Sequence, residues 1–447
     1  MSFPRYPEYK DSGVEWLGEV PAHWDVTALK RGFNVTLGKM LQPESNNPDD
    51  ELLPYLRAAN IQWGGVDTTD IKQMWLSKRD RNQLRLEIGD LLVSEGGDVG
   101  RSCLWAAELD DCYFQNSVNR VRARSGSSNR YLYYWMSTIK DKGYIDVLCN
   151  KSTIAHFTAE KVAAAPVPFP TLPEQTKIAA FLDRETLKID ALVAEQRRLS
   201  ELLKEKRQAV ISHAVTKGLN PAAPMKPSGI EWLGDVPAHW TVIVLKRIAD
   251  VQTGVAKGKD NSMRTRITVP YLRVANVQNG YLDLETIATI EIPEEDLARY
   301  SLKPGDVLMN EGGDFDKLGR GHVWDGQIDP CITQNHVFAV RPRKVSSAWL
   351  NAITGSDFAQ FYFMTRSKQS TNLASISSTN LMELPVILPP VDEQQAILSF
   401  IADQTSHFDT LTAEAQRAID LLQERRSALI AAAVTGQMDV RQHEPLA

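Results

Sequence analysis

The chain has 447 residues, enough for about three folding units, and 43% of them are hydrophobic and 24% charged. This balance is typical of a folded globular protein and excludes a disordered or collagen-like chain. The formal net charge of −6 excludes a uniformly basic nucleic-acid binder, although basic patches on an acidic body remain compatible with it.

The beginning of the chain, MSFPRYPEYKDSG, has no apolar core of a signal peptide, and no run of about 18 apolar residues follows it. The four cysteines form no C-x-x-C pair, and no Cys/His cluster has the spacing of a zinc site. Sparse unpaired cysteines suit a reducing compartment. We therefore expect a cytoplasmic protein with no metal site.

The chain is a duplication. SGVEWLGEVPAHWDVTALKR (Ser12–Arg31) recurs as SGIEWLGDVPAHWTVIVLKR (Ser228–Arg247), with fifteen of twenty positions identical. The offset is 216 residues, and a later three-residue insertion makes it 219. The segments that match in the same order are Pro54–Gly64 with Pro270–Gly280, Gly89–Asp98 with Gly305–Asp314, and Gln115–Arg122 with Gln334–Arg341. This period is too long for a solenoid or propeller repeat, so each half is a domain with its connecting segment.

The first part of each half is rich in strand signals. Short apolar or alternating runs, such as Asp90–Val93 and Val118–Val121, lie between Gly, Asn and Asp turns. Helical patches such as Tyr131–Ile139 lie between them. We therefore expect α+β domains.

The second part of the first half predicts a long helix, because residues 174–216 contain neither Gly nor Pro. Pro173 suits its start and Gly218 its end. The 37 residues from Ile178 to Ala214 would span roughly 56 Å. The predicted apolar seam is Ile178, Leu182, Ile189, Leu192, Leu199, Leu203 and Val210.

A matching helix, Glu393–Thr435, ends the second half. Its predicted seam is Ile397, Ile401, Phe408, Leu411, Ala415, Ala418, Leu422 and Leu429. Such a seam needs a partner helix, and the other copy in the same chain can supply it. A duplicate that pairs with itself favours pseudo-two-fold symmetry, so we expect an antiparallel coiled coil with a globular part at each end. The residues expected to hold the pair are Leu182, Ile189, Leu203, Val210, Ile401, Phe408, Leu422 and Leu429.

The expected fold class is therefore α+β, with two tandem α/β domains separated by two long paired helices in a pseudo-two-fold duplication. The predicted segments are globular domains at 1–172 and 219–391, helices at 173–218 and 392–436, and a tail at 437–447.

Two repeated motifs are candidates for function. The EGGD segments, Glu95–Asp98 and Glu311–Asp314, each follow an apolar strand and precede a Gly-Arg pair. Adjacent glycines let a backbone approach a ligand closely, and the arginine could reach a phosphate. The alternative is a tight turn that needs positive φ. The other motif, Pro-Ala-His-Trp around His23 and His239, is interpreted as packing at the domain entrance and not as a catalytic histidine.

Basic and amide side chains in the globular parts suit DNA, because Arg and Lys contact phosphates while Asn and Gln match adenine edges. The DNA-binding candidates are Gln62, Lys78, Arg79, Arg81, Arg101, Asn116, Lys257, Lys259, Arg264, Arg266, Arg320, Gln334 and Asn335. Two basic runs among these are Lys78, Arg79 and Arg81, and Lys257, Lys259, Arg264 and Arg266. A third basic run comprises Arg120, Arg122, Arg124 and Arg130. Each run could equally be a solvated face.

Motifs of several enzyme classes are missing from the sequence. It contains no G-x-x-x-x-G-K-[ST] phosphate loop, no H-E-x-x-H, no G-x-S-x-G and no Gly-rich nucleotide fingerprint. The N/D-P-P-[YF] stretch of adenine methyltransferases is also missing. We therefore expect no catalytic residue in this chain and no cofactor bound by it.

The segment YKDSGVEWLGEVPAHWDVTALKR resembles the opening of specificity subunits of type I restriction-modification enzymes. PFPTLPEQTKIAAFLD (Pro168–Asp183) and ILPPVDEQQAILSFIAD (Ile387–Asp403) resemble the start of the long helix in that family. The resemblance covers nearly the whole chain. The second copy departs from the first at Asp392, which stands where the first has Pro173.

The resemblance implies that the two globular domains are target recognition domains, each of which reads half of a split double-stranded DNA target, and that the helices are a spacer. The subunit would be non-catalytic and would bind two modification (methyltransferase) subunits and restriction subunits. S-adenosylmethionine, ATP and Mg would be bound by those partners, and no membrane would be involved. The domains should read different sequences, since Trp63 matches Asn279 and Ser117 matches His336.

Two alternatives stay open from the residues alone. A structural scaffold could bridge two protein partners without reading DNA, and sequence-specific binding to a split site would distinguish it. An enzyme with an unrecognised nuclease or methyltransferase site would show catalysis by the isolated chain.

Overall fold

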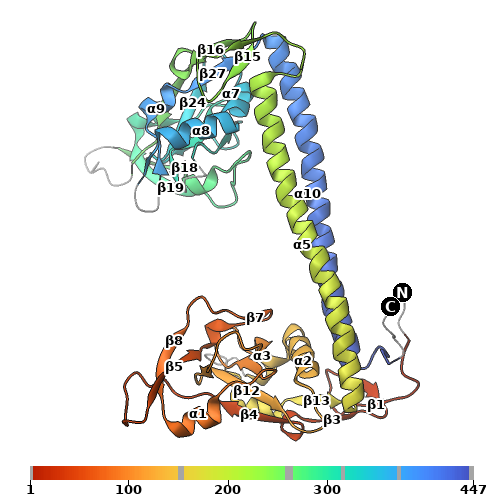
Figure 1. Ribbon diagram of the computed structural model, residues 1–447. Helices are drawn as coiled ribbons and strands as arrows, with labels where there is room; N and C mark the ends of the chain where they lie inside the picture. Colours follow the sequence, from red (N-terminus) through yellow and green to blue (C-terminus); the bar gives the residue numbers. More distant parts are fainter. Residues whose placement is uncertain (1–3, 150–155, 257–264, 314–317, 370–373, 442–447) are drawn as a thin grey trace. The chain divides into compact units, whose positions relative to one another are not determined.

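The computed structural model describes residues 4–149, 156–256, 265–313, 318–369 and 374–441. The chain forms two compact units, unit 1 with residues 1–197 and 417–447 and unit 2 with residues 198–416. The division cuts both long helices, α5 (Leu172–Lys217) and α10 (Val391–Val434). Each unit therefore contains one globular domain, the beginning of one long helix and the end of the other (Figure 1).

The globular domain of unit 1 is built on a four-stranded antiparallel sheet of order β10-β9-β12-β4. Its strands are β4 (Phe33–Leu37), β9 (Leu91–Ser94), β10 (Ser102–Leu104) and β12 (Val118–Ala123). A three-stranded mixed sheet of order β11-β5-β8 comprises β5 (Glu51–Leu56), β8 (Lys72–Leu76) and β11 (Tyr113–Phe114). The two-stranded pairs are β1 (Tyr9–Asp11) with β2 (Glu19–Pro21), β3 (Asp25–Ala28) with β13 (Pro166–Phe169), and β6 (Ile61–Gln62) with β7 (Gly65–Val66).

Short helices cover these sheets: α1 (Lys78–Leu84), α2 (Asn129–Asp141), α3 (Tyr144–Leu148) and α4 (Ala159–Ala164). Helix α2 begins after Ser128, whose hydroxyl accepts the amide hydrogen of Tyr131. Tyr131 and Trp135 are fully buried against the four-stranded sheet. The strand and helix predictions over Asp90–Val93, Val118–Val121 and Tyr131–Ile139 are confirmed.

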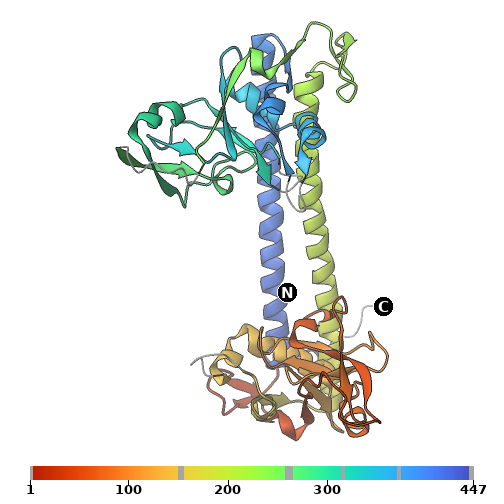
Figure 2. The same ribbon diagram turned by 90° about the vertical axis from the view of Figure 1, so that its left-hand side faces the viewer.

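Unit 2 repeats this plan (Figure 2). Its four-stranded sheet, of order β17-β24-β20-β22, comprises β17 (Ala249–Thr253), β20 (Val307–Asn310), β22 (Gly321–Val323) and β24 (Val337–Pro342). The sheet of order β19-β18-β23 comprises β18 (Arg266–Leu272), β19 (Ala288–Pro293) and β23 (Ile332–Thr333). Smaller sheets are β14 (Met225–Pro227) with β15 (Asp235–Pro237), β16 (Thr241–Val244) with β27 (Pro385–Leu388), and β21 (Gly312–Gly313), β26 (Ala374–Ser375) and β25 (Lys368–Gln369). Its short helices are α6 (Leu297–Tyr300), α7 (Ser347–Thr354), α8 (Asp357–Arg366) and α9 (Ser378–Met382).

Helices α5 and α10, of 46 and 44 residues, run antiparallel within each unit (Figure 1, Figure 2). In unit 1, Leu182 near the start of α5 shares a core with Ile430 near the end of α10. In unit 2, Val215 at the end of α5 shares a core with Ile397 at the start of α10. The mixed α/β class, the two domains and the long antiparallel helices are confirmed.

The helix seam differs in part from the prediction. Leu192 and Leu199 are 46% and 43% exposed, so the prediction is wrong at these two positions. Val193 is 9% exposed instead and packs with Ile189 and Ile419. On α10 the predicted seam residue Ala418 is only partly buried, and its neighbour Ile419 is buried.

The physical reason is that steps of three and of four residues both stay close to one helix face, and the partner helix decides between them. The hydrophobic pattern assigned Leu192 and Leu199 to the seam because the helix face that contacts the partner helix also carries polar residues. One of these is Arg207, which reaches Asp409 of α10 at 3.1 Å. The repeat-equivalent Arg426 of α10 reaches Asp190 of α5 at 2.9 Å.

The structure places the eight residues expected to hold the helix pair as follows. Leu182, Ile189, Leu203 and Phe408 are buried. The partly buried members are Val210, Ile401, Leu422 and Leu429.

Candidate nucleic-acid interface

A 3₁₀ turn after β5 organises the candidate residues of unit 1. The turn, Ala58–Asn60, is closed by Asn60, which is only 3% exposed. The Asn60 side chain accepts from the Arg57 amide at 2.9 Å and donates to the Asp67 carbonyl at 2.9 Å. A buried amide with these partners holds the turn in one shape.

Two predicted side chains attach to this turn. The Gln62 amide donates to the Ala59 carbonyl at 3.0 Å, and Arg101 Nη2 donates to the Ala58 carbonyl at 3.2 Å. The Ala58 amide in turn donates to Ser117 Oγ at 3.1 Å. The turn therefore brings together the EGGD-Arg loop and the residues that follow β11.

Asn116 extends the same line of contacts toward α1. Its backbone amide donates to the Lys39 carbonyl at 2.9 Å, and the Lys39 ammonium pairs with Asp80 in the first turn of α1. Burial alone would raise the pKa of Asp80, but hydrogen bonds from Lys39 and Ser77 outweigh it and hold this pKa below its usual value. The first turn of α1 is thereby held beside Asn116.

The start of α1 carries three predicted basic residues. Lys78 and Arg79 are exposed. Arg81 is partly buried and forms an ion pair with Glu51, so less of its charge faces solvent. We call Gln62, Lys78, Arg79, Arg81, Arg101 and Asn116 the recognition edge of unit 1.

Unit 2 has the same arrangement around the 3₁₀ turn Val274–Asn276. Asn276 is 3% exposed and donates to the Asp283 carbonyl at 2.9 Å. Arg320 Nη1 lies 3.5 Å from Gln278 Oε1, and Gln278 donates to the Ala275 carbonyl at 2.7 Å. The turn thus holds the second Gly-Arg loop as the first turn holds Arg101.

The amide candidates of unit 2 lie beside this turn. The Gln334 backbone amide donates to the Leu272 carbonyl at 2.8 Å, and the Asn335 amide donates to the Val255 carbonyl at 3.1 Å. Arg266 is exposed and pairs with Glu291 at 3.3 Å. We call Arg266, Arg320, Gln334 and Asn335 the recognition edge of unit 2. The predicted Lys257, Lys259 and Arg264 lie outside the described residues.

The glycines of the EGGD-Gly-Arg segments serve the backbone. Gly100 has φ +81°, and a Cβ there would lie 2.3 Å from Ile145. Gly319 has φ +70°, and its Cβ would lie 2.2 Å from Phe363. Positive φ and close packing therefore account for the glycines of the two Gly-Arg pairs. Of the adjacent glycines in the first EGGD segment, Gly97 has φ +70°, as a tight turn requires, and a Cβ there would meet no atom within 4 Å.

The third basic run is exposed only in part: Arg124 and Arg130 are exposed, whereas Arg120 and Arg122 of β12 are buried or partly buried. Arg120 is 8% exposed and donates to the Arg85 carbonyl at 3.0 Å. Arg122 makes two hydrogen bonds of 2.7 Å to the buried Asp90. Both lie on β12, a central strand, so their side chains reach neighbouring segments. The other members are also engaged within unit 1, since Arg124 bonds Asn34 and Arg130 pairs with Asp183.

The sequence analysis did not identify Lys39 and Gln278, which contact residues around the predicted candidates: Lys39 pairs with Asp80, and Gln278 lies next to Arg320. Lys39 follows Gly38, whose added Cβ would lie 2.2 Å from the Gln115 carbonyl oxygen. Gln278 is the repeat partner of Gln62, so the matched segments of the duplication could have identified it.

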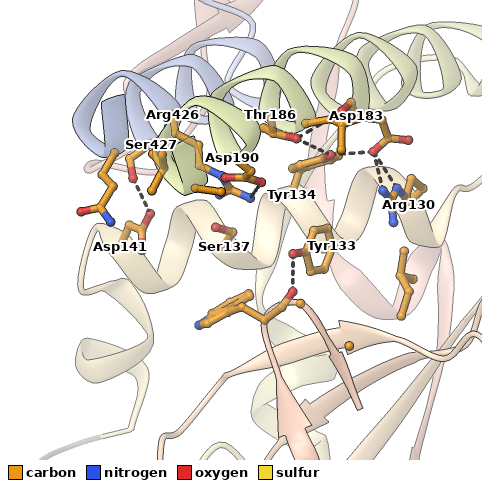
Figure 3. A pocket seen from close by; sticks show the side chains of 18 of the residues that line it. Arg130, Tyr133, Tyr134, Ser137, Asp141, Asp183, Thr186, Asp190, Arg426 and Ser427 are labelled. Carbon is orange, nitrogen blue, oxygen red and sulfur yellow. Dashed lines mark hydrogen bonds and ion pairs between the residues drawn. The ribbon is translucent and has the colours of Figure 1, made fainter. Parts of the chain in front are cut away.

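A hollow of about 860 Å³ lies in unit 1 where α2 faces α5 and α10 (Figure 3). Several of its polar side chains are paired with one another: Asp183 accepts from Tyr134 at 2.6 Å, and Ser427 donates to Asp141 at 3.2 Å. Leu187 in the lining is 71% exposed. This mixture of both charges with an exposed leucine suits a protein surface better than a phosphate.

Unit 2 has a hollow of about 250 Å³ at the corresponding place in the repeat. The lining positions that match between the two hollows include Trp63 with Asn279 and Ser427 with Gln208.

Within the described ranges, no three His, Cys, Asp or Glu side chains are grouped so as to hold a metal ion. None of the helices described is both long enough and apolar enough to cross a membrane.

Comparison with known proteins finds one matching family model, the type I restriction modification DNA specificity domain, at residues 21–201 and 237–420. The chain is 26% identical over 435 residues to the StySPI specificity subunit of Salmonella potsdam, covering 94% of this chain and 90% of that protein. It is 23% identical over 439 residues to the EcoKI specificity subunit of Escherichia coli K12, with the same coverage.

Two solved structures share the fold. One comes from work on complex assembly and conformational transition of the type I R-M system, with a TM-score of 0.67 and 16% identity over 93% of this chain and 98% of that one. The other is the HsdS subunit from Thermoanaerobacter tengcongensis, with a TM-score of 0.50, the same identity and the same coverage.

Proposed function

The chain belongs to the family of type I restriction-modification DNA specificity subunits, and on that premise we propose that it reads a bipartite DNA target, one half-site through each globular domain. Subunits of this family recognise the DNA target and are non-catalytic components that join methylase and restriction subunits. The part of the proposal that goes beyond membership of the family is the division of the target between the two domains of this chain.

The observation that carries the proposal is the repetition of the recognition edge. Each unit has a 3₁₀ turn closed by a buried asparagine, and the arginine of the Gly-Arg pair contacts this turn in unit 1 and Gln278 just after it in unit 2. The edges share Arg101 with Arg320 and Asn116 with Asn335. They differ at Lys78 and Arg79, which correspond to Glu294 and Glu295, and beside the shared asparagine, where Ser117 corresponds to His336. His336 also lies 3.0 Å from Glu311, which gives the second edge an exposed polar pair of its own. Similar scaffolds with different side chains suit two half-sites of different sequence.

We assign the spacer role to α5 and α10, which correspond to the proposed segments 173–218 and 392–436. A helix rises 1.5 Å per residue, so the 46 residues of α5 are about 69 Å long. Half-sites one DNA turn apart are separated by about 34 Å. Because both recognition domains are attached to the same two helices, the protein itself would set the number of base pairs between the two half-sites.

We also propose that the two hollows bind the two modification subunits, one in each unit. The matching lining positions support two equivalent contacts, and the paired charges and exposed Leu187 suit a protein partner. S-adenosylmethionine, ATP and Mg would then be bound by the partner subunits and not by this chain.

The test is a genome-wide map of adenine methylation after co-expression of the chain with its cognate modification subunit. The proposal predicts methylation confined to one motif of two short half-sites with a fixed gap. Absence of methylation from an assembled complex supplied with methyl donor would contradict DNA reading and favour a scaffold between proteins.

Removing the two exposed charges of α1 tests the edge of unit 1. Lys78→Ala with Arg79→Ala is expected to weaken DNA binding by the assembled complex and to lower the slope of log affinity against log salt by about 1.8, because each lost phosphate contact removes about 0.9. The measurement is fluorescence anisotropy over a salt series.

The matched control is Lys30→Ala with Arg31→Ala, another exposed Lys-Arg pair in unit 1. It removes the same charge but lies outside the edge, so its salt slope should match that of the unmodified complex. Equal slopes for the two double variants would show that net charge alone sets binding.

A further inference from the structure

A buried glutamate joins the globular domain of unit 1 to the start of α5. Glu174 lies in the first turn of the helix and is 5% exposed. Its carboxylate accepts from Trp24 Nε1 at 3.1 Å and from the Tyr6 hydroxyl at 2.8 Å, and it lies 3.0 Å from His23 Nε2. Burial and the hydrogen bond to Glu174 raise the pKa of Tyr6, which keeps its hydroxyl a donor. The positive end of the helix dipole also favours a carboxylate here.

The same tryptophan meets the end of the other helix. Gly436 follows α10, has φ +73°, and a Cβ there would lie 3.1 Å from the Trp24 ring and 2.2 Å from Pro21. Trp24 itself is fully buried. The PAHW motif is therefore a packing element, and it lies where the beginning of one long helix and the end of the other meet one domain.

Unit 2 repeats this joint. Glu393 in the first turn of α10 accepts from Trp240 Nε1 at 3.0 Å and lies 2.7 Å from His239 Nε2. Gly218, which ends α5 with φ +76°, would place a Cβ 3.1 Å from the Trp240 ring. We call Trp24, Glu174 and Gly436 the first joint, and Trp240, Glu393 and Gly218 the second joint.

We propose that Glu174 and Glu393 are positioning residues that fix each recognition domain on the helix pair and so restrict the gap between half-sites that the subunit accepts. This inference rests on the proposed reading of a split target. It adds residues that touch no DNA but control which DNA is methylated.

Several contacts fix the domain of unit 1 on the long helices. Leu182 of α5 and Ile430 of α10 lie in its hydrophobic core, and Asp183 pairs with Arg130. Glu174 adds a charge-assisted contact that recurs in unit 2. The covalent link at the start of α5 by itself would leave the domain free to rotate about single bonds. The hydrogen bond from Trp24 to Glu174 restricts this rotation, because it joins residues 150 positions apart in the chain. The packing of Gly436 against Trp24 attaches the end of the second helix to the same place. Charge-assisted hydrogen bonds are about twice as strong as neutral ones, and a bond to a rigid indole fixes direction as well as distance.

The comparison of the two units supports a role in spacing. The recognition edges have diverged in part, since Lys78 and Arg79 of unit 1 correspond to Glu294 and Glu295 of unit 2. Both joints keep the same glutamate, indole and imidazole, and each has a glycine after a long helix. Selection of different half-sites requires different edges. A single gap requires that both domains be held in the same manner.

The experiment uses the full chain with its modification subunit on a plasmid library. The two half-sites mapped for the unmodified chain are placed at every gap from three base pairs below to three above the natural gap. The readout is the ratio of methylation at the natural gap to that at neighbouring gaps. Trp24→Phe removes only the indole donor, and Glu174→Gln removes the charge but keeps an oxygen acceptor.

Both variants are expected to lower this ratio about tenfold, as the loss of one charge-assisted hydrogen bond would do, without changing the bases preferred within either half-site. Trp240→Phe in the second joint should act in the same way. The control is Glu185→Gln, since Glu185 pairs only with Lys188 and Arg184 of its own helix among the contacts described. It should leave the ratio unchanged.

A merely structural role would reduce methylation at all gaps in proportion and leave the ratio intact, and that result would overturn the inference. If Glu174→Gln does not yield a folded complex, Trp24→Phe decides the question, because it keeps an aromatic ring in the core. Failure of the unmodified complex to show a fixed gap would instead remove the proposed function itself.

Discussion

Val193→Asp is expected to lower the free energy of unfolding of unit 1 by about 3 kcal/mol, because it places an unpaired carboxylate in a buried contact. Val193 is 9% exposed and packs against Ile189 of its own helix and Ile419 of α10. A carboxylate at this position would lose its hydration and would face the apolar side chain of Ile419 on the partner helix. Urea denaturation followed by circular dichroism measures the change.

The neighbouring residue is the matched control. Leu192 is the larger side chain but is 46% exposed, so Leu192→Asp should change the free energy of unfolding by less than about 0.5 kcal/mol. A greater loss from Leu192→Asp than from Val193→Asp would show that the helices pair through the leucine face. The order of the two effects therefore tests the helix pairing itself.

Asp306→Ala is expected to destabilise unit 2 by about 3–5 kcal/mol, because it leaves a guanidinium without its buried partner. Asp306 is 1% exposed and accepts from Arg341 at 2.7 Å and 2.6 Å, and it also accepts from the Lys303 amide at 2.8 Å. The hydrogen bond to Asp306 raises the pKa of Arg341 and outweighs the opposing effect of burial.

Thermal unfolding of the full chain measures this loss, and an exposed pair in the same domain provides the comparison. Asp250 is 62% exposed and lies 3.4 Å from Arg343, so Asp250→Ala should cost less than about 1 kcal/mol. Equal costs for the two substitutions would mean that the Asp306 pair is no more than a surface contact. The repeat-equivalent pair of Asp90 and Arg122 in unit 1 should behave like Asp306 and Arg341.

Much of the candidate site could be found from the sequence because the duplication marks matching positions. Gln62, Arg101 and Asn116 were identified as candidates. The structure connects Gln62 and Arg101 through the turn Ala58–Asn60, and the Ala58 amide donates to Ser117, the neighbour of Asn116. The arginines of β12 could not be sorted in this way. An exposed arginine and one that pairs with a buried aspartate look alike in a sequence, because their partners are some thirty residues away, as Asp90 is from Arg122.

The sequence by itself determined the duplication, the domain type, the long helices with their bounds to within two residues, and the family. These depend on local periodicity and on the similarity of the two copies, both of which are written along the chain. Only the tertiary structure decided which helix face is covered, which arginines stay exposed, and why Glu174 and Trp24 recur as a pair. The reason is that burial and hydrogen bonding at these positions depend on segments far away in the chain. Local propensity does not indicate which of these segments packs against a given residue.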